Sequence, residues 1–200
     1  MQLYIMRHGE TSWNKARMIQ GRTDTELTER GIEMAEKTAK GMKNIDFECI
    51  YSSPLTRAYK TAEIIRAGRD IPIIKDERLF EVCFGEWEGA NIDERQDQLE
   101  KFFDDPVKYV ATRGAESYED ILSRAKSFLE EVIYPLKDKE DDCKVLIAGH
   151  AAINRGLSAI LMNTELKDFW AEPHRKNCAV DIYEITKDGI KAIQEAGYYY

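Results

Sequence analysis

The sequence predicts an α/β fold in which helices cover both faces of a largely parallel β-sheet. Short apolar runs typical of buried strands alternate with segments whose apolar residues recur at helical spacing. Polar residues directly follow three of these runs, and ligands bind at the carboxyl ends of strands in open α/β sheets. The 200 residues fit one domain, so we expect residues 1–200 to form one unit.

The composition is that of a protein with a substantial core and a charged surface, since 43% of the residues are apolar and 33% are charged. No apolar run reaches the ~18 residues of a membrane-spanning helix, and no signal peptide is evident. The net charge of −8 argues against nucleic acid or an anionic membrane as the main partner. The four cysteines show no CxxC spacing, so we expect free thiols in a cytoplasmic protein.

The first part of the chain predicts two strands and two helices. Leu3–Met6 and Phe47–Tyr51 are the expected strands. Thr28 is the expected N-cap of the first helix, and Ser52–Pro54 is expected to open the second, which runs to Gly68. The inward face of the first helix is predicted to consist of Ile32, Ala35, Ala39 and Met42.

The less regular stretch 71–114 is predicted to be an excursion over the active edge of the sheet, because it is too short and charged for a separate core. An amphipathic helix, a buried strand, a second helix and two strands joined by a turn follow. Their expected bounds are Ser117–Leu136, Lys144–Ala148, Ala151–Met162, Asn177–Ile185 and Ile190–Ala196.

Two arginines and two histidines follow the ends of predicted strands. Arg7 and His8 come after the first, Arg57 shortly after the second and His150 after the third. Because parallel strands bring their carboxyl ends to one edge, we expect these side chains to converge. Arginine matches phosphate geometry, and a neutral imidazole can attack phosphorus. The cluster therefore predicts phosphoryl transfer, with a carboxylic acid of the excursion protonating the leaving alcohol.

Five sequence blocks resemble, in order, the signatures of the histidine phosphatase superfamily, also called the phosphoglycerate mutase-like family. They are Arg7-His8-Gly9-Glu10-Thr11 with Trp13-Asn14, Leu27-Thr28-Glu29-Arg30-Gly31, Ser52-Ser53-Pro54-Leu55-Thr56-Arg57-Ala58, Phe84-Gly85-Glu86-Trp87-Glu88-Gly89, and Gly149-His150 through Arg155. The resemblance covers nearly the whole chain. It implies a three-layer α/β/α fold with a mixed, mostly parallel sheet, in agreement with the apolar pattern.

The resemblance also implies roles for individual residues. His8 matches the nucleophile that becomes phosphorylated, and Glu81 matches the proton donor. Gln20 and Gly21 match a loop beside the substrate. The residues that match or adjoin the phosphate pocket are Arg7, Arg57, His150, Asn14 and Ala151 through its backbone N–H. We expect no cofactor, no metal site, and a small phosphorylated molecule as the partner.

Two positions depart from the family pattern. Ala151-Ala152 follow His150 where glycine is common, so the added methyl could narrow the pocket or shift the loop. Phe80 stands where many relatives carry a polar residue, which changes the expected wall beside Glu81.

Several candidate residues have alternative interpretations. Glu81 lies close in sequence to Glu77, Glu86 and Glu88, and the alternative to a proton donor is a solvated acidic loop. His174 is expected at the surface. The aromatic residues of the excursion could line a lid suited to organic phosphomonoesters or pack a small core of their own; they are Trp87, Phe102, Phe103 and Tyr109.

The preferred function is hydrolysis of a phosphomonoester by a histidine acid phosphatase-type enzyme, and phosphoglycerate mutase is the alternative. Mutases of the family carry an arginine pair in the excursion, whereas this excursion has Arg95 and Arg113 singly. A non-catalytic phosphate-binding or signalling module is a minor alternative. Such a module is expected to have lost a catalytic group, and this sequence retains all of them. Candidate substrates are sugar phosphates, phosphoglycerates and the ribazole phosphate of cobalamin synthesis.

Overall fold

A six-stranded mixed β-sheet forms the centre of the computed structural model, which describes residues 1–94, 98–138, 142–171 and 173–199. In spatial order the strands are β3 (Ile73–Lys75), β2 (Cys49–Ser52), β4 (Lys144–Gly149), β1 (Gln2–Arg7), β5 (Val180–Thr186) and β6 (Gly189–Gly197). The first four pair in parallel, and β5 pairs antiparallel with both β1 and β6. The predicted mixed, mostly parallel sheet is therefore confirmed.

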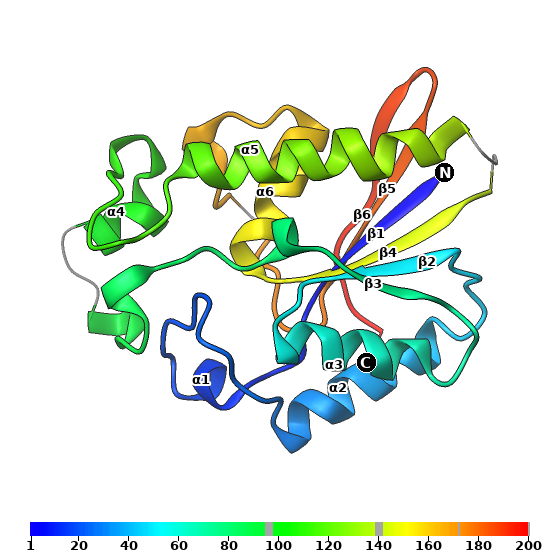
Figure 1. Ribbon diagram of the computed structural model, residues 1–200, viewed down its shortest axis with the longest axis horizontal. Helices are drawn as coiled ribbons and strands as arrows, with labels where there is room; N and C mark the ends of the chain where they lie inside the picture. Colours follow the sequence, from blue (N-terminus) through cyan, green and yellow to red (C-terminus); the bar gives the residue numbers. More distant parts are fainter. Residues whose placement is uncertain (95–97, 139–141, 172, 200) are drawn as a thin grey trace.

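Helices cover both faces of this sheet (Figure 1). α2 (Glu29–Gly41) and α3 (Thr56–Arg66) lie on one face, and α5 (Tyr118–Phe128) and α6 (Ala151–Met162) lie on the other. The central strands are apolar throughout because successive side chains enter opposite layers. In β1, Leu3 and Ile5 pack into one apolar cluster and Tyr4 and Met6 into the other.

Shorter elements connect these layers. The remaining helices are α1 (Ser12–Lys15) and α4 (Gln98–Asp104), with 3-10 turns at Glu77–Leu79, Gly85–Trp87, Ile92–Glu94, Pro106–Lys108 and Leu166–Asp168. In the described part of the chain, no helix is long and apolar enough to cross a membrane. All four cysteines are free thiols.

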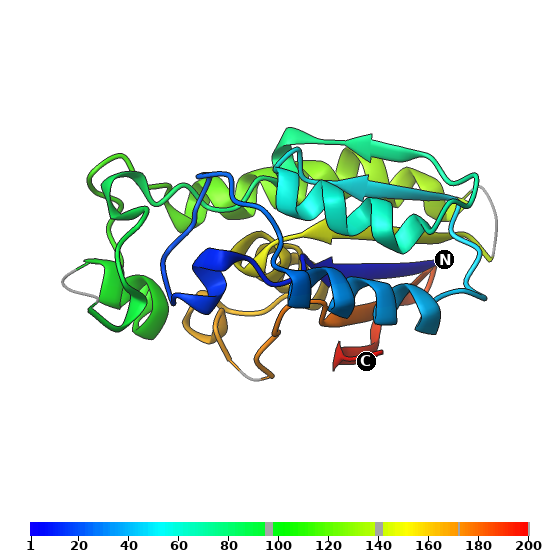
Figure 2. The same ribbon diagram turned by 90° about the horizontal axis from the view of Figure 1, so that it is seen from below.

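The register of the parallel strands aligns their carboxyl ends. Arg7, the last residue of β1, is opposite Gly149, the last residue of β4, and Ser52 at the end of β2 is opposite Ala148. Beyond the strands, the His8 N–H donates to the Gly149 carbonyl at 3.0 Å. These ends face α1 and the excursion, which extends past the sheet in both views (Figures 1 and 2).

The starts of α2 and α3 have different caps. Thr28 caps α2 as predicted, since its Oγ1 accepts from the Gly31 N–H at 3.0 Å. The expected opening of α3 at Ser52–Pro54 is wrong, because the helix begins at Thr56. Asp24 accepts from the Thr56 N–H with both carboxylate oxygens at 3.0 Å. Sequence pattern could not show this, because the capping residue lies 32 positions away.

The predicted buried face of α2 is correct for Ala35, Ala39 and Met42 but not for Ile32, which is only partly buried. Met34 and Thr38 are buried in its place. The hydroxyl of Thr38 donates to the Met34 carbonyl at 2.9 Å, so this buried polar group has a hydrogen-bond partner.

Two boundaries in the middle of the chain differ from the prediction. Residues 73–75 form edge strand β3, so the excursion begins after the sheet and not at residue 71. The predicted helix Ser117–Leu136 changes its hydrogen bonding after Phe128, with a π-helix over Leu129–Ile133 and a 3-10 turn over Tyr134–Asp138. Pro135 explains the change, because it lacks an N–H and clashes with the preceding turn of an α-helix.

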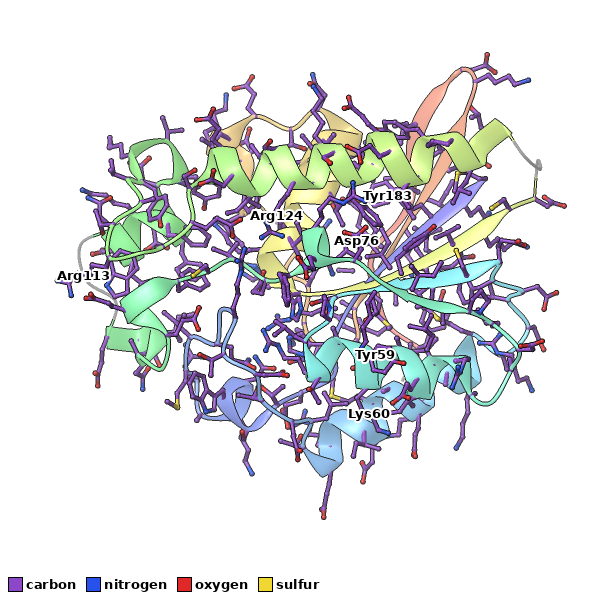
Figure 3. All side chains as sticks on the ribbon, viewed as in Figure 1. Tyr59, Lys60, Asp76, Arg113, Arg124 and Tyr183 are labelled. Carbon is purple, nitrogen blue, oxygen red and sulfur yellow. The ribbon has the colours of Figure 1, made fainter. Side chains whose placement is uncertain are left out.

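The excursion packs against the body through an aromatic cluster and one arginine. Phe102 is fully buried, and its ring contacts those of Phe84, Tyr118 and Trp170. Arg124 of α5 pairs with Glu116 and donates from Nη1 to the carbonyls of Arg78 and Phe80, both at 2.6 Å (Figure 3). This contact fixes the backbone directly before Glu81.

Arg113, the described one of the two excursion arginines, does not line the cavity at the aligned strand ends. Arg113 lies at the outer edge of the excursion (Figure 3), 62% exposed and 3.7 Å from the Glu86 carboxylate. Arg95 lies outside the described residues.

Candidate active site

A cavity of about 120 Å³ lies at the carboxyl end of β1 and the start of α6. Every predicted site residue except His150 lines it: Arg7, His8, Asn14, Gln20, Gly21, Arg57, Glu81 and Ala151. His150 is adjacent, with its ring centroid 5.1 Å from that of His8. Apolar side chains complete the wall, and they are Met18, Ile19, Phe84, Ile92, Phe103 and Trp170.

His8 is held in one tautomer. Its Nδ1 is 2.7 Å from the Gly9 carbonyl oxygen, and because a carbonyl oxygen can only accept, Nδ1 carries the proton. Nε2 is therefore left with its lone pair. Burial, with the positive charges of Arg57 and Arg7, lowers the pKa of His8 well below 6.5. The ring is thus neutral and nucleophilic at Nε2 at neutral pH.

Two glycines allow the chain to turn at His8. A Cβ on Gly9 would lie 2.6 Å from the Gly31 carbonyl oxygen, and one on Gly31 would lie 2.1 Å from the Glu10 carbonyl oxygen. The backbone after β1 therefore packs directly on the start of α2. This close approach gives a physical reason for both glycines in the sequence blocks Arg7–Thr11 and Leu27–Gly31.

His150 has the opposite tautomer. The Arg57 Nε–H can only donate, and it lies 3.2 Å from Nδ1 of His150, so the neutral His150 ring carries its proton on Nε2. Burial and the charge of Arg57 lower the pKa of His150 well below 6.5, which keeps the ring neutral.

Two donors beside His8 are buried without a hydrogen-bond partner among the described residues: Nε2 of His150 and Nε of Arg7. Leaving a buried donor unpaired costs about 1–3 kcal/mol. Another nitrogen of Arg7, Nη1, donates to the Arg175 carbonyl at 2.9 Å and so fixes the guanidinium in place. The arrangement is suited to an anion that accepts from both donors.

Arg57 is anchored on the opposite side by the loop after α1. Its Nη1 donates to the Thr23 carbonyl at 2.8 Å and its Nη2 to the Gly21 carbonyl at 2.6 Å. Burial lowers the pKa of Arg57, and the nearby Glu81 carboxylate opposes that shift. Arginine stays protonated at neutral pH even so, which makes Arg57 a fixed positive charge in the cavity.

Glu81 is buried and occupies the N-terminus of α6. Its carboxylate accepts from the N–H groups of Val82, Ala152 and Ile153 at distances of 3.0–3.2 Å. Glu81 is 7% exposed, whereas Glu77 and Glu86 are exposed, so burial distinguishes it from the rest of the acidic stretch. A carboxylate here complements the helix dipole.

The Phe80 prediction is wrong. Its ring does not line the cavity, because it lies under the guanidinium of Arg22 with 5.5 Å between the guanidinium carbon and the ring centroid. Ala151, one of the two positions that depart from the family's glycine, lines the cavity. His174 is exposed, as expected.

The structure adds two residues that sequence reasoning missed. The Asn177 amide Nδ2 donates to the carbonyls of His8 and Gly9 at 3.0 and 3.2 Å and to Asn14 Oδ1 at 3.0 Å. Glu88 accepts from the N–H groups of Arg22 and Thr23 at 2.9 and 2.8 Å. Asn177 therefore fixes the nucleophile's turn.

The same contacts explain Asn14 and Gln20. Oδ1 of Asn14 also accepts from the Thr11 N–H at 3.1 Å, which leaves the amide Nδ2 as its donor toward a ligand. Oε1 of Gln20 accepts from the hydroxyls of Thr11 and Thr25 at 2.9 and 2.6 Å. Within the described ranges, no cluster of three His, Cys, Asp or Glu side chains is placed to hold a metal ion.

Comparisons with known proteins find relatives that match most of the chain. The model of the histidine phosphatase superfamily (branch 1) matches residues 3–195. Phosphoserine phosphatase 1 of Hydrogenobacter thermophilus is 31% identical over 86% of this chain and 81% of its own length. "Probable phosphoglycerate mutase GpmB" of Escherichia coli O1:K1 is 31% identical over 90% of this chain and 83% of its own. The solved structure of YhfR from Bacillus stearothermophilus has a TM-score of 0.88 at 35% identity, covering 98% of this chain and 96% of that one.

We predict that the two neutral, buried histidines make stability fall as the solution is acidified below about pH 6.5. In the unfolded chain they take up protons near that pH, whereas in the folded protein their pKa values lie well below it. The unfolded state thus binds more protons, and the free energy of unfolding falls by on the order of 1 kcal/mol per pH unit for each histidine.

Urea titrations between about pH 7.5 and pH 5.5 measure this slope, the sign of which follows from the lowered folded-state pKa. The His8→Gln protein should show a shallower pH dependence than the unsubstituted protein, because one titrating group is gone. If the free energy of unfolding depended on pH equally in the two proteins, His8 would not be a buried histidine with a lowered pKa.

Proposed function

Because the chain belongs to the histidine phosphatase superfamily (branch 1), we propose that it is a metal-independent phosphomonoesterase acting through a phosphohistidine at His8. One observation carries the proposal. The proton-free Nε2 of His8 lies beside two buried donors, Arg7 Nε and His150 Nε2, that have no partner among the described residues. A phosphoryl group at this position would accept from both while its phosphorus faces the nucleophile.

The first step transfers the phosphoryl group to the enzyme. Nε2 of His8 donates its lone pair to phosphorus as the bond from phosphorus to the ester oxygen breaks. The charge on the phosphoryl oxygens is balanced by Arg7, Arg57 and the His150 N–H, which are fixed before the substrate arrives. The two guanidinium groups supply the positive charge that a metal ion supplies in other phosphoryl transfer enzymes, and the neutral His150 adds a hydrogen bond.

Glu81 is the proposed proton donor for the leaving alcohol. In the proposed step Glu81 enters as the carboxylic acid, beside the bound phosphoryl group. The acid gives its proton to the ester oxygen, and the resulting carboxylate accepts the backbone N–H groups of Ala152 and Ile153. In the second step the same carboxylate takes a proton from water, which attacks phosphorus and breaks its bond to Nε2.

The size of the cavity favours a small substrate. Its volume of about 120 Å³ is below the ~300–1,000 Å³ of pockets that hold drug-sized ligands. The wall formed by Phe84, Phe103 and Trp170 suits the organic part of a phosphomonoester. Two of the relatives are named for phosphoserine and phosphoglycerate, both small phosphorylated acids, and we include this class among the candidate substrates.

Mutase activity is the second candidate, and the similarity to the E. coli protein named for it is the observation that favours it. Isomerisation requires the product to be retained until it is phosphorylated at another hydroxyl. Arg113, the described one of the two excursion arginines, pairs with Glu86 at the outer edge and does not line the cavity. We therefore prefer hydrolysis.

We predict that the protein releases phosphate from small phosphomonoesters in the presence of a chelator. His8→Ala should lower kcat/KM by at least about 10³-fold, because it removes the covalent route. Lys37→Ala, a change on the exposed face of α2, should retain full activity. Interconversion of phosphoglycerates without phosphate release would instead establish the mutase, and the absence of both reactions would favour a non-catalytic module.

We predict that Glu81→Gln is sensitive to the leaving group. Alkyl phosphates need protonation of the departing alkoxide, so their kcat should fall by about 10²–10⁴-fold. The burst of nitrophenolate from p-nitrophenyl phosphate should survive, because this leaving group departs without a proton. Glu86→Gln, in the exposed pair with Arg113, is the matched control and should affect neither substrate. An equal loss with both substrates would rule out the proton-donor role.

A further inference from the structure

A second cavity of about 200 Å³ adjoins the one at His8. The two cavities share three wall residues, Arg7, Ala151 and Trp170. The second is otherwise lined by Arg155 of α6 and by the segment that leads into β5, at Arg175 and Lys176 together with His174. The second cavity therefore lies directly beside the first, with these three residues in common.

The walls of this second cavity carry an excess of positive charge. No carboxylate is found among its described lining residues. Arg175 is neutralised from behind, since it forms ion pairs with Asp181 and Glu195. Arg7, Arg155 and Lys176 form no ion pair with a carboxylate within the described ranges, although Glu81 lies near Arg7 and Asp181 and Glu195 lie near Arg155.

Arg155 is the least exposed of the cations contributed by the second cavity alone, with a relative exposure of 9%. Its one described hydrogen bond runs from Nη2 to the Pro173 carbonyl at 2.8 Å. Burial and the adjacent charge of Arg175 lower the pKa of Arg155 to about 10. The guanidinium is still protonated at neutral pH, but burial makes its charge unfavourable. An anion bound beside its N–H groups would offset that desolvation penalty.

We propose that this cavity binds a second anionic group of the substrate, a carboxylate or a second phosphoryl group. The inference rests on the proposed function, because it assigns the first phosphoryl group to His8. It narrows the substrate class to phosphorylated compounds with a second anion on a short linker. Arg7 contacts the anion on each side, and Arg155 and Lys176 bind the second one.

The test compares substrates that differ only in the second group. 3-Phosphoglycerate and glycerol 3-phosphate differ by a carboxylate in place of a hydroxymethyl group. 1,3-Propanediol bisphosphate and its monophosphate form the corresponding phosphoryl pair. The measured quantity is the kcat/KM of the substrate with two anionic groups divided by the kcat/KM of its partner with the phosphate alone. The pair that gives the larger ratio shows whether the second cavity prefers a carboxylate or a phosphoryl group.

In the unsubstituted protein the ratio should exceed about tenfold for one pair, as expected for charge-assisted hydrogen bonds. Arg155→Gln and Lys176→Gln should each lower it, and the double substitution should bring it near unity. Lys187→Gln, which removes an equal charge in the exposed turn between β5 and β6, is the control and should leave the ratio unaltered. Because Lys176 is exposed, its variant keeps the test valid where Arg155→Gln fails to fold.

Ratios near unity in the unsubstituted protein, or ratios that survive both substitutions, would overturn the subsite while leaving the phosphatase intact. Absence of turnover with all four compounds would overturn the proposed function instead. Calorimetric titration of the same compounds would then still decide the subsite, since the anionic member of a pair should bind more tightly and lose that advantage in Lys176→Gln.

Discussion

The parallel pairing of β1 with β4 is the constraint on which the site depends. Its register sets Arg7 opposite Gly149, so the residues that follow, His8 and His150, leave the sheet side by side. The His8 N–H donates to the Gly149 carbonyl, which continues the pairing by one further bond. A shift of one residue would exchange the faces of the whole strand, and both apolar layers therefore enforce the position of the nucleophile.

The site concentrates positive charge in a protein whose net charge is −8. Long-range attraction cannot bring a phosphate to such a surface, so binding depends on fixed charges at short range. Arg7 and Arg57 are anchored by backbone carbonyls, and the two histidines are kept neutral beside them. Glu81 is the only described carboxylate lining the cavity, and the start of α6 stabilises it. The result is a pocket that is rigid and ready for an anion.

The sequence predicted the groups that face the cavity because strand ends are visible in the apolar pattern. His8, Arg57 and His150 each follow a strand by a few residues, and one rule about parallel sheets brings them together. Their supports could not be found in this way. Asn177, Glu88 and Asp24 act through backbone groups 32 to 169 positions away, and nothing local marks such contacts.

Other elements were missed for reasons of their own. β3 is a three-residue edge strand whose side chains are partly or fully exposed. Its apolar run, Ile71-Pro72-Ile73-Ile74, is short and contains a proline, so it does not have the pattern of a buried strand. The helical periodicity after Ser117 continues through Pro135, although the hydrogen bonding there changes to π and 3-10. Arg155 was visible only as the end of a family block, and its surroundings depend on the segment before β5. Periodicity reports which face is buried, and it does not report which backbone groups are bonded.

The most direct test of the account is the position of the phosphoryl group on the enzyme. The protein would be mixed rapidly with a phosphomonoester and denatured in alkali, where phosphohistidine survives, and then digested for mass spectrometry and phosphorus NMR. The account predicts a phosphoryl group on His8, attached through Nε2, because the Gly9 carbonyl holds the proton on Nδ1. Attachment through Nδ1, attachment at another residue, or phosphate release with no phosphoenzyme at any mixing time would contradict it.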